Sequence, residues 1–150
     1  MFGEIAELYD HYRPAYPERL VDDLVELVPL DAGEIGLEVG AGTGQATAMF
    51  AERGIQVVAV EPSAEMAAVA HRNCSAYPGV MIEESDFEHW DRSGREFPLG
   101  FSAQAWHWVV PEVKYAERGR RCGPVASWRR SGTVRCGAGQ ACGRLFWPVY

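Results

Sequence analysis

The sequence predicts an α/β fold of the doubly wound kind, with a mostly parallel sheet, over residues 1–117. Short apolar runs alternate there with segments of helical spacing, which is the order of strands and crossover helices. A loop with glycines at 40, 42 and 44 follows the first run, and an acid, Glu61 or Asp86, follows each of the next two. Because the carboxyl ends of parallel strands meet at one edge of the sheet, these residues predict a ligand site at that edge.

Two helices are expected before the first strand. Residues 4–12 carry apolar side chains at helical spacing, and the segment 13–17 interrupts them. Pro17 suits the first turn of a second helix, whose apolar side chains form one broad face up to residue 28. Pro29 ends this second helix.

Strands and helices then alternate. Strands are expected at 35–39, 55–60, 80–82 and 101–110, and helices at 45–53 and 64–73. The run 55–60 is apolar almost throughout, which is typical of a strand buried on both faces. Ser63 is placed to cap the helix that follows it, and Gly54 is placed to end the helix before it.

Charge and composition exclude several classes of protein. Residues 1–117 hold 7 of the 14 Lys and Arg and all 21 Asp and Glu, a net charge of −14. Such an acidic body is a poor partner for nucleic acid, so we expect no nucleic-acid partner. No apolar run reaches the roughly 18 residues of a membrane span, and the N-terminus lacks a basic patch followed by an apolar core. We therefore expect no membrane partner, no signal peptide and a cytoplasmic location.

The cysteines do not predict a metal site. Cys122, Cys136 and Cys142 form no CxxC pair, and no histidine follows His107. Zinc sites need closely spaced Cys or His ligands, so these three cysteines are expected to be free thiols. Cys74 follows a helical pattern and is expected to be a small apolar side chain.

The glycine loop permits several interpretations from the residues alone. The glycines can simply form a tight turn between a strand and a helix. A dinucleotide site has the pattern G-x-G-x-x-G, which Gly40 and Gly42 fit, but position 45 is Gln and the third glycine stands one residue early. The pattern here is E-x-G-x-G-x-G, from Glu38 to Gly44. A backbone without side chains can lie flat along a nucleoside ligand that has no pyrophosphate.

The segment 37–45, together with residues 58–63 and Met66, resembles the motif I region of class I S-adenosylmethionine-dependent methyltransferases, and in particular the methyltransferase type 11 group. The resemblance covers about residues 4–117. It implies a Rossmann-like sheet, S-adenosylmethionine as the cofactor and methyl transfer to an acceptor, which we expect to be a small molecule. The resemblance also implies that the cofactor contacts the residues of the loop: Glu38, Gly40, Ala41, Gly42 and Gly44.

The same resemblance gives roles to the later acids. Glu61, followed by Pro62, would accept hydrogen bonds from both ribose hydroxyls of the cofactor. The segment 85–88 is similar to the family's G-D-A-E-type segment, in which Asp86 would accept the adenine amino group and the backbone N–H of Phe87 would meet the ring. From the residues alone, 85–88 can also be a solvated acidic loop.

Two further segments resemble the same group. Residues 9–17 are similar to its N-terminal lid, in which Arg13 would pair with the methionine carboxylate, and Tyr9 or Tyr16 would wall the methyl pocket. Residues 102–109 are similar to its fourth-strand region, where His107 would serve as a general base near the methyl group. From the residues alone, the first segment can be a surface segment and His107 a packed side chain.

Two departures limit the resemblance. Pro98 and Gly100 disfavour a strand, so the fourth strand is expected only from Phe101 onward. Residues 118–150 hold 7 Arg and no acid, are rich in Gly and Cys, and show neither helical nor strand periodicity. We expect this tail to be irregular, and we hypothesise that the reading frame is lost near Glu117, because such a composition is typical of a coding sequence read out of frame.

The tail has functional consequences. Residues 1–117 would form only the N-terminal half of the methyltransferase domain, with an unpaired edge on the fourth strand. The acceptor pocket, which the missing half helps to build, would be incomplete, so we expect weak or no catalysis. Two other functions remain open from the sequence. One is an NAD(P)-dependent oxidoreductase, which the third glycine disfavours, and the other is a non-catalytic remnant of an enzyme.

Overall fold

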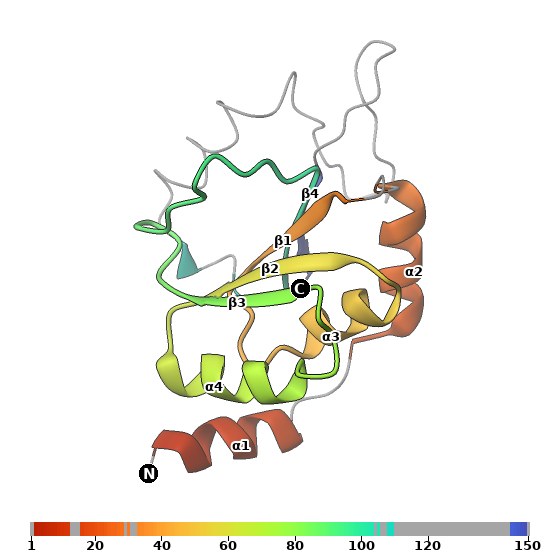
Figure 1. The fold of residues 1–150 in the computed structure, drawn as a ribbon. Helices are drawn as coiled ribbons and strands as arrows, with labels where there is room; N and C mark the ends of the chain where they lie inside the picture. The colour runs from red at the N-terminus through yellow and green to blue at the C-terminus, as the bar shows by residue number, and fades with distance from the viewer. Residues whose placement is uncertain are drawn as a thin grey trace.

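The computed structural model describes residues 2–12, 16–28, 30, 33–103, 105, 108, 109 and 145–149, which contain one parallel sheet with helices beside it (Figure 1). Its elements, in chain order, are α1 (Phe2–Tyr12), α2 (Glu18–Leu27), β1 (Ile35–Val39), α3 (Gln45–Glu52), β2 (Gln56–Glu61), α4 (Ala64–Asn73), β3 (Val80–Glu84), β4 (Leu99–Ala103) and β5 (Leu145–Val149). The strand order is β3-β2-β1-β4-β5, and each neighbouring pair is parallel. The predicted α/β, Rossmann-like fold class is confirmed.

Strand β2 is buried on both faces, as its apolar run predicts. Val57 and Ala59 point into a core cluster that also contains Phe50 of α3 and Phe101 of β4. The alternate residues of β2 point to the opposite face and pack with Leu37 and Val39 of β1 and with the later segment of the chain, through Phe87, Trp90, Phe97 and Val109. The alternation of side chains along a strand therefore divides the apolar side chains between two cores.

The helix boundaries agree with local capping rules. Ser63 caps α4, because its hydroxyl accepts the Met66 backbone N–H at 3.3 Å. Gly54 follows α3 with a φ of +80°, a left-handed conformation that glycine adopts at helix ends without steric cost. Helix α2 buries Val21 and Leu24, as its apolar face predicts. Leu27 was expected on the same face, but it is 56% exposed, so the prediction is wrong for this residue.

The fourth strand differs from its prediction. It begins at Leu99, directly after Pro98, and all five of its residues are buried. A proline is compatible with the start of a strand, and Gly100 is accommodated because it pairs in register with Leu37 inside the sheet. The strand also ends earlier than expected, at Ala103, and the Trp108 N–H then bonds back to the Ala105 carbonyl at 2.9 Å, which closes a turn.

The outer edge of β4 is paired. Residues 145–149 form β5 within the tail that was expected to be irregular, and they pair in parallel with β4 from Leu99↔Leu145 to Ala103↔Val149. The expectation of an unpaired edge is therefore wrong for the part of the chain that the structure describes. Pairing with β5 provides hydrogen-bond partners for backbone N–H and C=O groups on the outer side of β4, which would otherwise be exposed at the edge of the sheet.

We predict that Phe101→Ala lowers the free energy of unfolding by about 3–5 kcal/mol, the usual cost of truncating a buried aromatic side chain. Phe101 is 1% exposed and stacks on Phe50 with ring centroids 4.1 Å apart, so the truncation removes contacts between β4 and α3. Urea unfolding followed by circular dichroism measures the change. Leu27→Ala is the control and should cost at most about 0.5 kcal/mol, since the side chain is mostly exposed. Equal losses in the two variants would contradict the assignment of the core.

Candidate functional site

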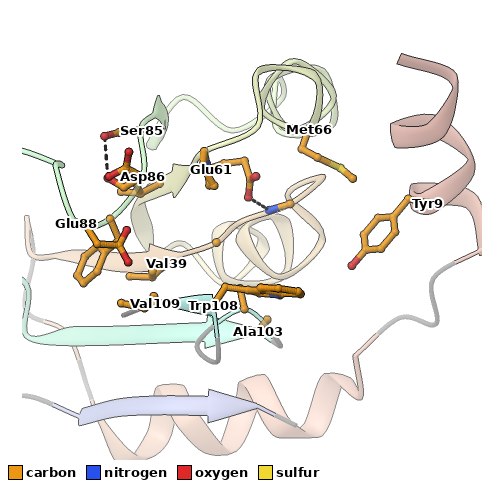
Figure 2. A pocket seen from close by; sticks show the side chains of 16 residues that line it. Tyr9, Val39, Glu61, Met66, Ser85, Asp86, Glu88, Ala103, Trp108 and Val109 are labelled. Atoms are coloured by element: carbon orange, nitrogen blue, oxygen red, sulfur yellow. Dashed lines mark hydrogen bonds between the residues drawn. The ribbon is translucent and has the colours of Figure 1, made fainter. Parts of the chain in front are cut away.

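A cavity of about 410 Å³ lies at the carboxyl edge of the sheet, where β1, β2, β3 and β4 end (Figure 2). Its volume is within the range of small-molecule sites. Helix α1 contributes Tyr9, which Figure 2 shows pointing from that helix toward Trp108. Helix α4 contributes Met66, and the remaining lining residues come from the strand ends and the loops after them: Val39, Gly40, Gly42, Val60, Glu61, Pro62, Ser85, Asp86, Phe87, Glu88, Ala103, Ala105, Trp108 and Val109.

The glycine loop brings backbone, and not side chains, to the cavity. Gly40, Gly42 and Gly44 have φ values of +73°, +58° and +81°, a region that other residues rarely adopt. The N–H groups of Gly40 and Ala41 both donate to the Val60 carbonyl, at 2.8 and 3.2 Å, which fastens the start of the loop to the end of β2. A Cβ at Gly40 would lie 2.2 Å from the Cβ of Ala105, so the loop also passes closely by the segment after β4.

Glu61 holds the loop from the neighbouring strand. Its Oε2 accepts the Gly42 N–H at 2.7 Å, and its Oε1 accepts the Ser63 N–H at 3.0 Å. The residue is 7% exposed and lines the cavity. A carboxylate has about four acceptor positions, so each oxygen of Glu61 has one backbone donor and capacity for a further one.

Glu38 lies beneath the loop, outside the cavity lining. It is completely buried, and its Oε2 accepts the hydroxyl of Thr47 on α3. Ala41 is likewise buried in the core. Of these predicted residues, the structure therefore brings Gly40 and Gly42 to the cavity, whereas Glu38 and Ala41 are buried and do not line it.

Gly44 packs against helix α4. A Cβ at this position would lie 3.1 Å from the Cβ of Ala70 and 3.1 Å from the Sγ of Cys74. The Cys74 thiol is buried and donates to the Gly44 carbonyl at 3.6 Å. Burial raises the pKa of Cys74 to about 11, and the negative charge of Glu38 acts in the same direction. Gly44 thus allows α3 and α4 to approach each other.

Asp86 and Phe87 lie at the end of the cavity near β3. Asp86 Oδ1 accepts the His89 backbone N–H at 2.9 Å and contacts Nδ1 of the same histidine. These hydrogen bonds lower the pKa of Asp86, which therefore presents a carboxylate at neutral pH. Phe87 lines the cavity and packs against the apolar side chains of β1 and β2. Pro62 completes the cavity lining after β2, so Gly40, Gly42, Glu61, Pro62, Asp86 and Phe87 meet in one place as predicted.

Helix α1 is attached to the site by polar contacts. The amide nitrogen of Gln45 donates to the backbone carbonyl of Asp10 at 3.1 Å, and Asn73 donates to the Asp10 carboxylate at 3.1 Å. The same Asn73 amide donates to the Thr43 carbonyl of the glycine loop at 2.9 Å. These contacts place Tyr9 at the cavity. Tyr16 is not among the lining residues, and its hydroxyl donates to the Ala103 carbonyl at 3.4 Å.

Two predicted site residues, Arg13 and His107, lie outside the described residues. Within the described part of the chain, no group of three or more His, Cys, Asp or Glu side chains is arranged to hold a metal ion. Among the same residues, no helix has the length and apolar character needed to cross a membrane.

Sequence reasoning missed several residues of the site. Thr47 and Asn73 support the glycine loop but lie in helices, where no local pattern distinguishes them from surface residues. Ala105 approaches Gly40 closely, which depends on how the chain turns after β4. The place of Glu88 in the lining could have been predicted, because Glu88 belongs to the segment 85–88 that is expected to contact the adenine.

We predict that Gly40→Ala destabilises the fold by more than Gly54→Ala. Both glycines have a positive φ, which costs an alanine about 1–2 kcal/mol. No atom lies within 4 Å of a Cβ at Gly54, whereas a Cβ at Gly40 would collide with Ala105. Urea unfolding of the two variants separates the strain of the backbone from the collision. Equal destabilisation would show that Ala105 does not approach the loop as described.

We predict that the contribution of Cys74 to stability falls as the pH rises from about 9 to about 11. The folded state keeps the thiol proton up to about pH 11, whereas the unfolded chain loses it near its ordinary value of 9.0. The unfolded state therefore binds fewer protons in this window, and the free energy of unfolding falls. The difference in this free energy between the wild type and Cys74→Ala should shrink across the window, because the variant lacks the thiol. A difference independent of pH would contradict the burial of Cys74.

Comparisons with known proteins identify the family. A family model described as a methyltransferase domain matches residues 37–122. An uncharacterized methyltransferase of Mycobacterium tuberculosis is 37% identical over 142 residues, an alignment that covers 89% of this chain and 56% of the relative. Since 89% of 150 residues is about 134, the similarity continues beyond residue 117 into the tail. The chain spans little more than half the length of this relative.

Solved structures show the same fold. The CcbJ methyltransferase from Streptomyces caelestis superposes with a TM-score of 0.55 at 26% identity, over 66% of this chain and 41% of that one. An RNA methyltransferase from Salinibacter ruber, in complex with S-adenosylhomocysteine, superposes with a TM-score of 0.52 at 21% identity, over 71% of this chain and 67% of that one. With a family match over more than half of its residues and the glycine loop at the predicted edge of the sheet, the chain belongs to the methyltransferase domain family, the class I S-adenosylmethionine-dependent methyltransferases.

Proposed function

We propose that this chain binds S-adenosylmethionine in the cavity at the carboxyl edge of the sheet and forms the cofactor half of an enzyme that methylates a small molecule. The observation that carries the proposal is the position of Glu61. Its carboxylate lines the cavity, is held by two backbone N–H groups, and has one further acceptor position on each oxygen. Two adjacent hydroxyls of a ribose match this pair of acceptors.

The remaining lining residues fit the other parts of the cofactor. The backbone at Gly40 and Gly42 leaves room beside the ribose for the amino acid portion, because neither residue carries a side chain. Asp86, an ionised carboxylate, is placed to accept the amino group of an adenine, and Phe87 offers an apolar ring beside the base. The described lining contains three carboxylates, from Glu61, Asp86 and Glu88, and no Lys or Arg. This charge suits a cationic sulfonium ligand and is unfavourable for the pyrophosphate of a dinucleotide.

The chain's own residues act mainly by binding and orientation. The cofactor supplies a methyl group on a positively charged sulfur, which makes that carbon an electrophile. Glu61 and the glycine loop fix the cofactor on one side, while Tyr9 and Trp108 bound the opposite side of the cavity. Fixing two reactants in a closed site can supply about 7–11 kcal/mol of the acceleration. We propose that His107 accepts a proton from the hydroxyl or amine of the methyl acceptor.

A small-molecule acceptor is supported by charge. The acidic balance of −14 over residues 1–117 opposes the approach of a nucleic acid. The structural similarity to an RNA methyltransferase concerns the fold, and that protein is 21% identical. The match to a methyltransferase domain also disfavours the alternative of an NAD(P)-dependent oxidoreductase. A non-catalytic remnant is the remaining alternative, and a measurement of cofactor binding distinguishes it from the proposed function.

We predict that Glu61→Gln weakens the binding of S-adenosylhomocysteine by about 1.5–3 kcal/mol, the scale of a hydrogen bond to a charged group. The amide removes the charge and places a donor beside the backbone N–H groups that now donate to the carboxylate. Isothermal titration calorimetry of the purified chain measures the affinity. Glu26→Gln, on the exposed face of α2, is the matched control and should bind like the wild type. Heat with NAD, and none with S-adenosylhomocysteine, would refute the proposed function.

A further inference from the structure

Five side chains form a cluster behind the Asp86 end of the cavity: Glu83, Phe87, Trp90, Arg95 and Phe97. Glu83 is the acidic member of this cluster. In the structure it lies in β3, paired in register with Val60 of β2, so it is part of the rigid sheet. We call these five residues the Arg95 cluster.

Arg95 is the centre of this cluster. Its guanidinium binds Glu83 through two hydrogen bonds, Nη1 to Oε1 at 2.6 Å and Nη2 to Oε2 at 3.1 Å. The two side chains are 26% and 31% exposed, so the pair is partly shielded from water. The hydrogen bond from Arg95 holds the pKa of Glu83 below its usual value, which keeps the pair ionised at neutral pH. A bidentate ion pair of this kind fixes the plane of the guanidinium as well as its position.

The fixed guanidinium in turn supports two aromatic rings. Its central carbon lies 5.3 Å from the Trp90 ring centroid and 5.9 Å from that of Phe97, distances at which a cation attracts the face of a ring. Trp90 also donates its indole N–H to Glu83. The Trp90 ring is therefore fixed both through its face and through its nitrogen.

Trp90 connects Arg95 to the lining of the cavity. Its ring stacks on Phe87, with centroids 6.1 Å apart and planes inclined by 22°. Phe87 lines the cavity, and Asp86 precedes it in the chain. A continuous series of contacts thus runs from the sheet through Glu83, Arg95 and Trp90 to the residues that face the base. This is the kind of supporting layer that sets the position of binding groups.

We infer that Arg95 is a positioning residue for nucleobase recognition: it fixes Phe87 and Asp86 through Trp90, and thereby makes the cavity selective for an adenine over a base that lacks the exocyclic amino group. The inference rests on the proposed function. Selectivity follows because the Asp86 carboxylate accepts from an amino group, whereas a base with a carbonyl oxygen there would face it with a second acceptor. If Phe87 and Asp86 were free to move, the cavity would bind adenine and a base that lacks the amino group with similar affinity.

The test compares two ligands, S-adenosylhomocysteine and S-inosylhomocysteine, by calorimetry on the whole chain. The wild type should bind the adenine compound at least about tenfold more tightly, the scale of one unsatisfied charged group. Arg95→Ala should lose about tenfold in affinity for the adenine compound and less for the other, so that the ratio of the two affinities moves toward one. Arg95→Lys keeps the charge but not the two-pronged geometry, and should give an intermediate ratio.

Arg53→Ala is the matched control. Arg53 also pairs with a carboxylate, Asp22, at 2.6 Å, and its side chain is 18% exposed, but it lies away from the cavity. Both alanine variants are expected to lower the melting temperature, and Arg53→Ala should keep the wild-type ratio. An unchanged ratio in Arg95→Ala, or an equal change in Arg53→Ala, would overturn the inference. Absence of S-adenosylhomocysteine binding by the wild type would instead overturn the proposed function on which it rests.

Discussion

The bonds between the end of β2 and the glycine loop are the interaction on which the site depends. The Val60 carbonyl accepts two N–H groups from the loop, and the Glu61 carboxylate accepts a third from Gly42. These bonds exist only because β1 and β2 are parallel and in register, from Ile35↔Gln56 to Val39↔Val60. The sheet thus fixes the loop, and the loop fixes the shape of the cavity. The Glu61 carboxylate both holds the loop and lines the cavity, so under the proposed function it would link the stability of the loop to ligand binding.

Much of the fold and part of the site could be predicted from the sequence because the signals are local. The alternation of apolar runs and helical spacing gave the element order, and Ser63 and Gly54 marked helix ends by their own chemistry. The acids at the strand ends could be placed together because parallel topology alone brings them to one edge. Gly40, Gly42, Glu61 and Asp86 accordingly line one cavity, whereas Gly44, expected with them, packs against α4. Their contacts with a ligand stay predictions.

The remaining features depend on contacts between distant segments. The sequence placed Glu38 among the ligand contacts, but whether an acid in a strand faces a ligand or a helix depends on packing, and here it bonds to Thr47. The predicted start of β4, at Phe101, is two residues late, because Pro98 and Gly100 disfavour a strand locally. In the fold, burial of the strand between β1 and β5 outweighs this local preference. The pairing of residues 145–149 with β4 could not be predicted, since it joins segments more than 40 residues apart, and the boundary expected at residue 117 stays a prediction.

Helix α1 illustrates how access and stability can be separated in one domain. Among the side chains of α1 that the structure describes, residues 5–12, Ala6 is buried at 1% exposure, whereas Ile5, Leu8 and Tyr12 are 56%, 55% and 75% exposed. Its described attachments include the polar bonds of Asp10 and an exposed ion pair between Glu7 and Arg72. Detaching residues 5–12 would therefore expose little apolar surface, and we expect the free energy of such a local opening to be smaller than that of global unfolding. Under the proposed function, such an opening would let the cofactor enter or leave beside Tyr9 while both cores of the sheet stay closed.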